Sequence, residues 1–222
     1  MHRILVINPN SNDAVTTGIS LALDDLRNDE EREIDCITLH EGPFGVESQA
    51  DIETVEPLLV EAMALYDDYD AYVIACYSDP GLALCRAISD KPVFGIQESA
   101  ARTAMELAPK FGVAAISDAS IKRHLFYLEQ MGVTDRLAAE RPLNMSVAET
   151  GSDQSLPVLT TVASQLRDED GAGAIIMGCT GMAPHRAVLE ETLGIPVIDP
   201  TQAAVAMALR HLEISGEKIE FC

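Results

Sequence analysis

The sequence predicts an α/β protein built from two similar Rossmann-like (flavodoxin-like) halves, each a parallel sheet covered by helices. Two observations predict this fold. Short apolar runs alternate with helical patterns along the chain, and one strand–turn–helix–strand segment occurs twice in related form. Because the chain has 222 residues and 47% of them are hydrophobic, it can bury a sizeable core.

The predicted strands are nearly continuous Val, Ile and Ala, as expected for strands that are buried on both faces of a parallel sheet. They cover residues 3–8, 34–39, 71–76, 93–96, 112–117, 173–178 and 196–199. Helical patterns cover residues 12–27, 52–67, 80–90, 98–109, 119–131, 155–169, 184–193 and 201–215. Strands that alternate with helices form right-handed βαβ units, so parallel pairing follows.

The internal repeat consists of residues 70–95 and residues 173–199. Each copy has an apolar strand, a Cys at its carboxyl end, a short polar turn, a Pro that opens a helix, and a second strand led by Pro. The Cys of the first copy is 16 residues before its second Pro, and in the second copy the spacing is 17. The repeat therefore predicts two halves related by a pseudo-twofold axis.

We expect the first half to comprise residues 1–97 together with 200–222, and the second half residues 98–199. In open α/β sheets, ligands bind outside the carboxyl ends of the strands. Two such edges that face each other form one cleft, with the thiols of Cys76 and Cys179 on opposite walls. The sequence therefore predicts an active site in the cleft between the halves.

Cys76 and Cys179 are the candidate catalytic residues. Each is expected just before a helix, whose positive end would stabilise a thiolate, and Asp79 suits the N-cap of the first of these helices. One thiolate can remove a proton from carbon while the other thiol delivers a proton to the opposite face, which inverts a stereocentre without a cofactor. The alternative is an inert buried Cys, but matching positions in a repeat favour catalysis. A structural or peripheral role is expected for the others: Cys36, Cys85 and Cys222.

Composition argues against several function classes. The chain carries 15 Lys and Arg against 36 Asp and Glu, a net charge of −21, so neither nucleic acid nor an anionic membrane is an expected partner. We expect a cytoplasmic protein, because neither a signal-peptide pattern nor an apolar run of membrane-spanning length is visible. Paired Cys-x-x-Cys and Gly-rich phosphate motifs are also missing, so no metal and no cofactor are expected.

Four segments resemble motifs of one known family. They are ILVINPNSN at 4–12, GPFGVES at 42–48, ACYSDPGL at 75–82 and GCTGMA at 178–183. These motifs are similar to those of the aspartate/glutamate/hydantoin racemase superfamily, most closely its hydantoin and allantoin racemase branch. The resemblance implies cofactor-independent racemisation by the two cysteines, a small hydantoin-like substrate and a homo-oligomer.

The resemblance also implies which residues contact the substrate. By motif position they are Asn10, Ser11, Phe44, Tyr77, Ser78, Ser117, Thr180, Gly181 and His185. Hydroxyls and backbone N–H groups among them would stabilise the enolate that proton removal creates. Gly181 replaces an acidic residue of the amino-acid racemases, which favours a cyclic or acylated substrate over a free amino acid.

Two of these assignments have alternatives: Tyr77 can point into the core, and His185 can be a solvated residue in the first turn of a helix. The carboxylate of Asp118, next to Ser117, would either repel an anionic group of the substrate or cap the helix that starts near residue 119.

The leading hypothesis is a racemase of a 5-substituted hydantoin or allantoin. Other superfamily chemistry is an alternative: an amino-acid racemase, an arylmalonate-type decarboxylase or a maleate-type isomerase. A non-catalytic small-molecule sensor is another. Decarboxylation and isomerisation of dicarboxylates need cations, for which the candidates near the motifs are Arg86, Arg102, Arg123 and Arg186.

Overall fold

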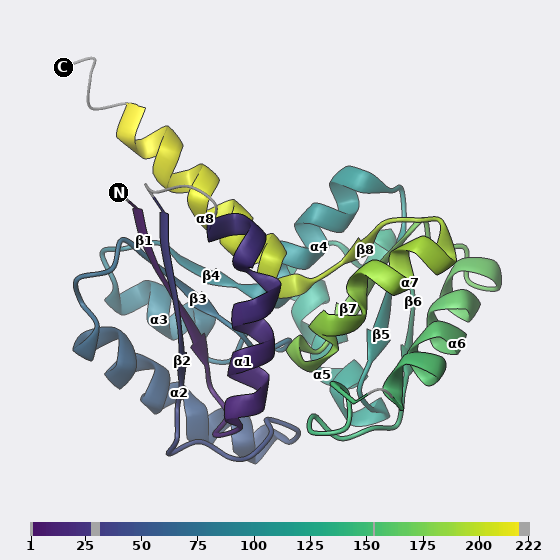
Figure 1. Cartoon of the computed structure of the whole chain (residues 1–222), viewed down its shortest axis with the longest axis horizontal. Coiled ribbons are helices and arrows are strands. Elements are labelled where there is room, and N and C mark those ends of the chain that lie inside the picture. Colours follow the sequence, from purple (N-terminus) through teal and green to yellow (C-terminus); the bar gives the residue numbers. More distant parts are fainter. Residues whose placement is uncertain (1, 28–31, 153, 218–222) are drawn as a thin grey trace.

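The structure, a computed structural model, contains two four-stranded sheets in which every strand pair is parallel (Figure 1). It describes residues 2–27, 32–152 and 154–217, so Cys222 lies outside the described residues. The strand order is β2-β1-β3-β4 in the first sheet and β6-β5-β7-β8 in the second. Since the two orders match along the chain, the predicted α/β fold with two similar halves is confirmed.

The first sheet consists of β1 (His2–Asn8), β2 (Arg32–Thr38), β3 (Ala71–Ile74) and β4 (Val93–Gly95). The helical segments between these strands are α1 (Asp13–Ala22), η1 (Asp24–Arg27), α2 (Gln49–Leu65) and α3 (Leu82–Ile88). The second sheet consists of β5 (Phe111–Ala115), β6 (Leu137–Pro142), β7 (Ala174–Gly178) and β8 (Val197–Ile198). The remaining helical segments are α4 (Ile96–Leu107), α5 (Asp118–Met131), η2 (Thr134–Arg136), α6 (Ser155–Asp168), η3 (Thr180–His185), α7 (Arg186–Leu193) and α8 (Pro200–Glu217).

One strand was not expected from the sequence, and the helices after both cysteines begin two residues later than expected. Strand β6 reads LAAERP and lies half-buried at a sheet edge, so it lacks the continuous Val and Ile of the central strands. Helix α3 begins at Leu82 rather than at Pro80, because Gly81 before it adopts a left-handed conformation with φ of 64°. Pro184 lies within the short 3₁₀ segment η3, and α7 begins only at Arg186.

Alternate residues of β1 face two different parts of the core, as the two-residue period of a strand requires. Leu5 and Ile7 pack beneath α2 and α3 in the smaller apolar cluster. Ile4 and Val6 point to the opposite face and belong to the larger cluster, which also includes the second sheet. All four side chains are at most 1% exposed, so the strand is buried on both faces.

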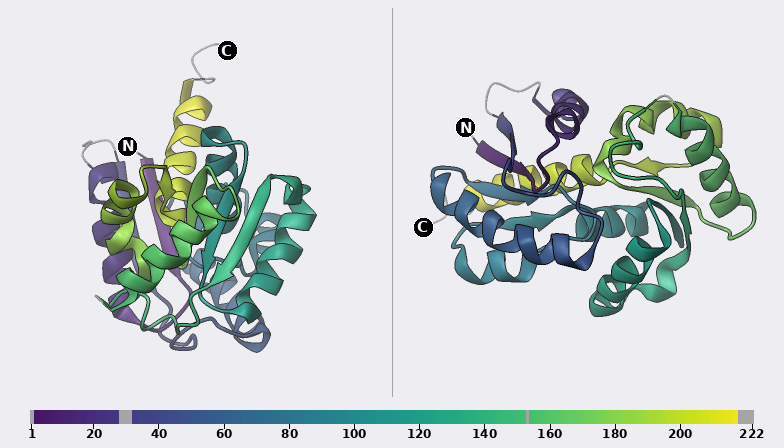
Figure 2. Two further views of the ribbon diagram at one scale, coloured as in Figure 1. Left: turned by 90° about the vertical axis from the view of Figure 1, so that its right-hand side faces the viewer. Right: turned by 90° about the horizontal axis from the view of Figure 1, so that it is seen from below.

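Helices α4 and α8 lie where the two sheets meet (Figure 2), and both contribute to the larger cluster. Their fully buried apolar side chains are mostly small: Ile96, Ala100, Ala101 and Ala104 in α4, and Ala204, Val205 and Ala208 in α8. Small side chains let the two helices approach each other and both sheets closely. Helix α8 contacts β1, β3 and β4 of the first sheet and also α4. Neither these nor the other helices of the described residues are long and apolar enough to cross a membrane.

Asp79 connects the turn after β3 to the start of α4. Its carboxylate accepts hydrogen bonds from the backbone N–H groups of Gln97 at 2.9 Å and Glu98 at 2.8 Å. The sequence-based assignment of Asp79 as the cap of the helix next to it is therefore wrong, since it caps α4 instead. The N-cap position of α4 is Gly95, where an added Cβ would lie 2.3 Å from the Asp79 carboxyl carbon.

We expect Gly95→Ala to lower the free energy of unfolding by about 2 kcal/mol, because the new methyl group displaces the capping carboxylate. Urea denaturation measures this change. Gly18→Ala in α1 is the matched control, since a Cβ there meets no atom within 4 Å. That variant should be neutral or more stable by up to about 1 kcal/mol. Equal stability of the two variants would contradict the capping role of Asp79.

Candidate active site

One cavity lies where the carboxyl ends of the two sheets meet. Strand β3 leads into Cys76 and strand β7 leads into Cys179, and both residues line this cavity. Cys76 is half-buried and Cys179 is 7% exposed. The repeated strand–Cys unit of the sequence thus places one thiol from each half at a shared cavity, whose volume is about 30 Å³.

The other walls combine short apolar side chains with polar groups. The first half contributes Asn10, Val46, Ala75, Tyr77 and Ser78. The second half contributes Ile116, Ser120, Arg123, His124, Val147, Gly178 and Thr180. Of the residues singled out from the sequence, the cavity therefore brings together Cys76, Cys179, Asn10, Tyr77, Ser78 and Thr180.

Five of the residues singled out from the sequence do not line the cavity. Phe44 is 62% exposed, and Ser11 donates its backbone N–H to the Pro43 carbonyl at 2.9 Å. Ser117 caps α5 by accepting a hydrogen bond from the Ser120 backbone. The last two, Gly181 and His185, lie beside Thr150 and Ser155 rather than in the wall of the cavity.

Two of the local alternatives weighed for these residues also fail. Asp118 is the exposed first residue of α5 rather than its cap, because Ser117 already satisfies the backbone N–H groups there. His185 is 6% exposed, so its assignment as a solvated residue is wrong. Its imidazole Nε2 is hydrogen-bonded to Ser155 Oγ at 2.8 Å.

The asparagine-rich turn after β1 orients Asn10 toward the cavity. Asn10 Oδ1 accepts hydrogen bonds from the Asn8 side chain at 3.0 Å and from the Asn12 backbone at 2.9 Å. Asn12 in turn caps α1. Because the carbonyl oxygen of the Asn10 side chain is occupied by the turn, its Nδ2 group is the atom left to donate a hydrogen bond to a bound molecule.

Burial raises the pKa of both thiols, which is the reverse of the expected helix-dipole effect. For Cys76, the nearby Cys179 and Asp79 raise the pKa further, and Arg123 partly opposes the rise. For Cys179, the backbone N–H of Gly181 and the hydroxyl of Thr150 partly oppose it. The expectation fails because both sulfurs are removed from water and no regular helix begins directly after either residue.

Of the face of α5 that lines the cavity, only Arg123 was expected from the sequence, as one of four candidate cations. Ser120, Arg123 and His124 have the i, i+3, i+4 spacing of one helix face. His124 Nδ1 lies 3.0 Å from Glu140 Oε2, and both side chains are 1% exposed. The Tyr77 ring meets the imidazole edge-on, with the ring centroids 4.8 Å apart. Burial raises the pKa of Glu140, which the His124 hydrogen bond partly opposes. Polar residues on the inward face of α5 are the signal that could have indicated this wall.

Among the described residues that line the cavity, Arg123 is the only Lys or Arg. Its Nη1 donates to the Ala119 carbonyl at 3.2 Å, and its Nε is buried without a hydrogen-bond partner. Among the other candidate cations, Arg102 pairs with Glu98. Arg123 is therefore the cation available to a molecule held between the thiols.

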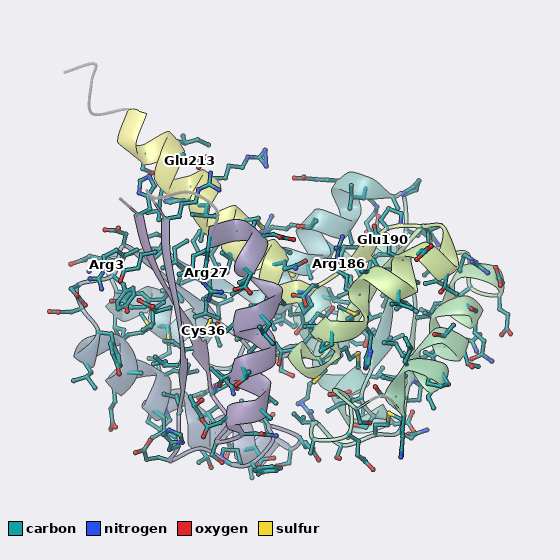
Figure 3. The ribbon with its side chains drawn as sticks, viewed as in Figure 1. Arg3, Arg27, Cys36, Arg186, Glu190 and Glu213 are labelled. Atoms are coloured by element: carbon teal, nitrogen blue, oxygen red, sulfur yellow. The ribbon has the colours of Figure 1, made fainter. Side chains whose placement is uncertain are left out.

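Arg86 and Arg186 are used by the fold at equivalent places in the two halves. The Nε of Arg86 donates to the Val93 carbonyl, and the Nε of Arg186 donates to the Val197 carbonyl. Each guanidinium also pairs with a Glu, which for Arg186 is Glu190 on the same helix (Figure 3). These arginines tie α3 and α7 to the adjacent strands β4 and β8. Elsewhere in the described residues, no group of three or more His, Cys, Asp or Glu is placed to hold a metal ion.

Comparison with known proteins agrees with this arrangement. A profile of the Asp/Glu/hydantoin racemase family matches residues 4–208. The chain belongs to this family. A hydantoin racemase of Paenarthrobacter aurescens is 35% identical over 212 residues, covering 93% of this chain and 89% of the relative. A hydantoin racemase of a Pseudomonas species is 36% identical over 211 residues, covering 93% and 84%.

The solved structure of allantoin racemase from Klebsiella pneumoniae has a TM-score of 0.92 to this chain. It is 30% identical, and the match covers 97% of this chain and 89% of that one. The resemblance seen in the four motifs is thus confirmed: this is a member of a racemase family, and it is similar to hydantoin and allantoin racemases over nearly its whole length.

The buried carboxyl group of Asp79, in the turn that carries Cys76, should make the stability of the protein depend on pH. Burial raises its pKa to about 7, whereas an unfolded Asp titrates near 3.9, at about the model-peptide value. Between these pH values the folded protein holds a proton that the unfolded chain has released. The free energy of unfolding contributed by this group therefore falls as pH rises from 4 to 7, by at most about 4 kcal/mol.

Urea denaturation of the wild type and Asp79→Asn at pH 5 and pH 8 measures this contribution. The difference in free energy of unfolding between the two proteins should shift in favour of the Asn variant as pH rises. A difference that is the same at both pH values would contradict the raised pKa.

Proposed function

We propose that this protein is a cofactor-independent racemase that inverts an acidic stereocentre of a hydantoin-type ring, either a 5-substituted hydantoin or allantoin. The observation that carries the proposal is the pair of thiols, one from each half, that line one cavity. The family supports racemase chemistry, and the hydantoin and allantoin racemases among its relatives support the ring as substrate.

The chemistry needs two proton transfers at one carbon. A thiolate on one wall takes the proton from the ring carbon and becomes a thiol, and the electron pair moves onto the adjacent carbonyl oxygen as an enolate. The thiol on the other wall then gives its proton to the opposite face of the carbon and becomes a thiolate. Atoms and charge balance, and the enzyme is left with its proton on the other cysteine, ready for the reverse reaction.

The enolate is the species that the cavity has to stabilise. Donors fixed in place stabilise such an oxyanion more than water does, because they do not have to reorient. We assign this role to Arg123 as the cation, supported by Asn10 Nδ2 and by the hydroxyls of Ser78 and Thr180, all of which line the cavity. The buried His124–Glu140 pair adds a second polar group on the same wall as Arg123.

Substrate entry requires the cavity to widen. Its volume of about 30 Å³ is room for only a few water molecules, which is less than a five-membered ring occupies. The two halves are joined by Glu47 of the first half, which accepts a hydrogen bond from the Val147 backbone of the second half at 2.8 Å. Closure around the ring would exclude water and hold both sulfurs near the reacting carbon.

Replacing either catalytic thiol should stop racemisation. We expect Cys76→Ser and Cys179→Ser each to slow it by roughly 1000-fold or more, because a serine hydroxyl is a far weaker acid and base at neutral pH. Polarimetry follows racemisation, and NMR in deuterium oxide follows exchange at the ring carbon. Each single variant should still exchange protons slowly on the enantiomer that faces its remaining cysteine.

Cys36→Ser is the matched control, because Cys36 lies in β2 beside Arg27, whose Nη2 is 3.6 Å from the sulfur (Figure 3). It should leave the rate unchanged. Full racemisation by the Cys76→Ser, Cys179→Ser double variant would falsify the two-thiol mechanism.

Arg123 should matter for the reaction rate. We expect Arg123→Met to lower kcat by roughly 100-fold or more, the effect of removing one donor from an oxyanion site. Arg123→Lys keeps the charge and should lose less. Arg102→Met, which removes a half-exposed arginine paired with Glu98, should change kcat by less than about twofold. Steady-state kinetics with both enantiomers measures these effects, and an unchanged kcat in Arg123→Met would refute the assignment.

A second candidate function rests on the same arginine. A guanidinium beside two thiols also suits a substrate carboxylate, as an arylmalonate-type decarboxylase or a maleate-type isomerase would require. Incubation with arylmalonates and maleate, followed by NMR, tests this function. Turnover of these acids without turnover of any hydantoin would replace the racemase proposal.

Two further expectations from the sequence stay as proposals. One is the division into residues 1–97 with 200–222 and residues 98–199, and the other is a homo-oligomer. Light scattering on the purified chain tests the second.

A further inference from the structure

We propose that Thr150 is a positioning residue for Cys179: its hydroxyl donates to the Val147 carbonyl while Cys179 is a thiol, and turns to the sulfur when Cys179 is a thiolate. The inference rests on the proposed function, since it explains how one of the two thiols holds negative charge. Thr150 lies in the turn before α6, outside every motif considered in the sequence, and is fully buried.

The hydrogen bonds at Thr150 define the first position of the hydroxyl. Its Oγ1 lies 2.7 Å from the Val147 carbonyl oxygen and 3.7 Å from Cys179 Sγ. A hydroxyl has one proton, and a carbonyl oxygen can only accept. The proton of Thr150 therefore points to Val147, and the Thr150 oxygen is left to accept the S–H proton of Cys179.

Loss of the Cys179 proton reverses this last hydrogen bond. A thiolate can only accept, so rotation about the Cβ–Oγ1 bond turns the Thr150 O–H toward the sulfur. The Val147 carbonyl is not left unpaired, because the backbone N–H of Thr150 also points to it at 3.4 Å. The backbone N–H of Gly181 gives the sulfur a second donor. A buried thiolate at Cys179 would thus have two hydrogen bonds.

The surroundings hold Thr150 in place. A Cβ on Gly181 would lie 2.2 Å from Thr150 Oγ1, so only glycine at this position leaves room for the hydroxyl. Ser155 Oγ lies 2.7 Å from the carbonyl oxygens of both Thr150 and Ser152, which can only accept. Because its single proton goes to these carbonyls, Ser155 accepts from His185 Nε2 at 2.8 Å. Gly181 and His185 therefore help to hold Thr150 in place, and neither lines the cavity.

Cys76 has no equivalent arrangement. Within the described residues, no hydrogen bond reaches its sulfur, and the charged group that favours its thiolate is Arg123 on the facing wall. Charge at Cys179 is opposed by the burial of its sulfur and by the nearby carboxylate of Glu47. Since Cys179 has two donors beside its sulfur, it is the thiol of the two that loses its proton more readily.

The test measures each cysteine separately. Wild type, Thr150→Val and Thr150→Ser are treated with iodoacetamide across a range of pH, and mass spectrometry follows alkylation of Cys179 and Cys76. Val keeps the shape of Thr without the hydroxyl, and Ser keeps the hydroxyl. We expect Thr150→Val to raise the alkylation midpoint of Cys179 by about one pH unit, as loss of one hydrogen bond to a charged group predicts, and to leave that of Cys76 in place.

Thr150→Ser should keep the wild-type midpoint at Cys179. In the wild type, Cys179 should also have a lower midpoint than Cys76. With a hydantoin as substrate, Thr150→Val should lower kcat/KM at pH 7 by about tenfold, and higher pH should restore part of the loss.

Three results would overturn the inference: an unchanged Cys179 midpoint in Thr150→Val, an equal shift at both cysteines, or the same shift in Thr150→Ser. Circular dichroism checks folding, and Thr150→Ala replaces Thr150→Val if the latter does not fold. The alkylation profiles need no substrate. A selective shift at Cys179 in a protein that racemises no ring would therefore support the role of Thr150 while refuting the proposed function.

Discussion

The apolar core that continues from one sheet to the other through α4 and α8 is the constraint on which the site depends. Each thiol is placed by its own strand, but the distance between the thiols is set by how the two sheets pack on these shared helices. Small buried residues such as Ala100, Ala104 and Ala208 keep that packing close. A core of this kind tolerates little change in volume, so it holds the carboxyl edges of the sheets face to face.

The closeness of the two halves has a chemical consequence for the thiols. Removal from water makes both cysteines weaker acids, so neither becomes charged without help from neighbouring donors or cations. The groups that stabilise a thiolate differ between the two walls. Cys179 has a backbone N–H and a hydroxyl beside it, whereas Cys76 faces the guanidinium of Arg123. An enzyme that moves one proton between two bases needs only one of them charged at a time, and unequal surroundings decide which one.

The internal repeat is retained where it builds the fold and altered where it builds the site. Arg86 and Arg186 make the same hydrogen bond to the neighbouring strand in the two halves. In contrast, the segment after Cys76 is a turn from which Asp79 caps α4, while a 3₁₀ segment follows Cys179. Asp199 caps α8 directly from the end of β8, through the N–H groups of Thr201 and Gln202. The pseudo-symmetry of the halves is therefore broken at the cavity.

The sequence by itself determined the α/β class, the two similar halves and the two cysteines at strand ends, because continuous apolar strands and a repeated motif are local patterns. It missed β6, since an edge strand carries no continuous apolar run. It named Arg123 only as one of four candidate cations, and it could not identify His124 or Thr150 as neighbours of the thiols, because tertiary packing brings their segments to the cavity. The tertiary structure alone decided that Phe44 faces solvent, that Asp79 caps a helix elsewhere in the chain, and that both thiols are poorly ionised. These properties depend on what is buried beside each group, and burial is set by the packing of the two halves.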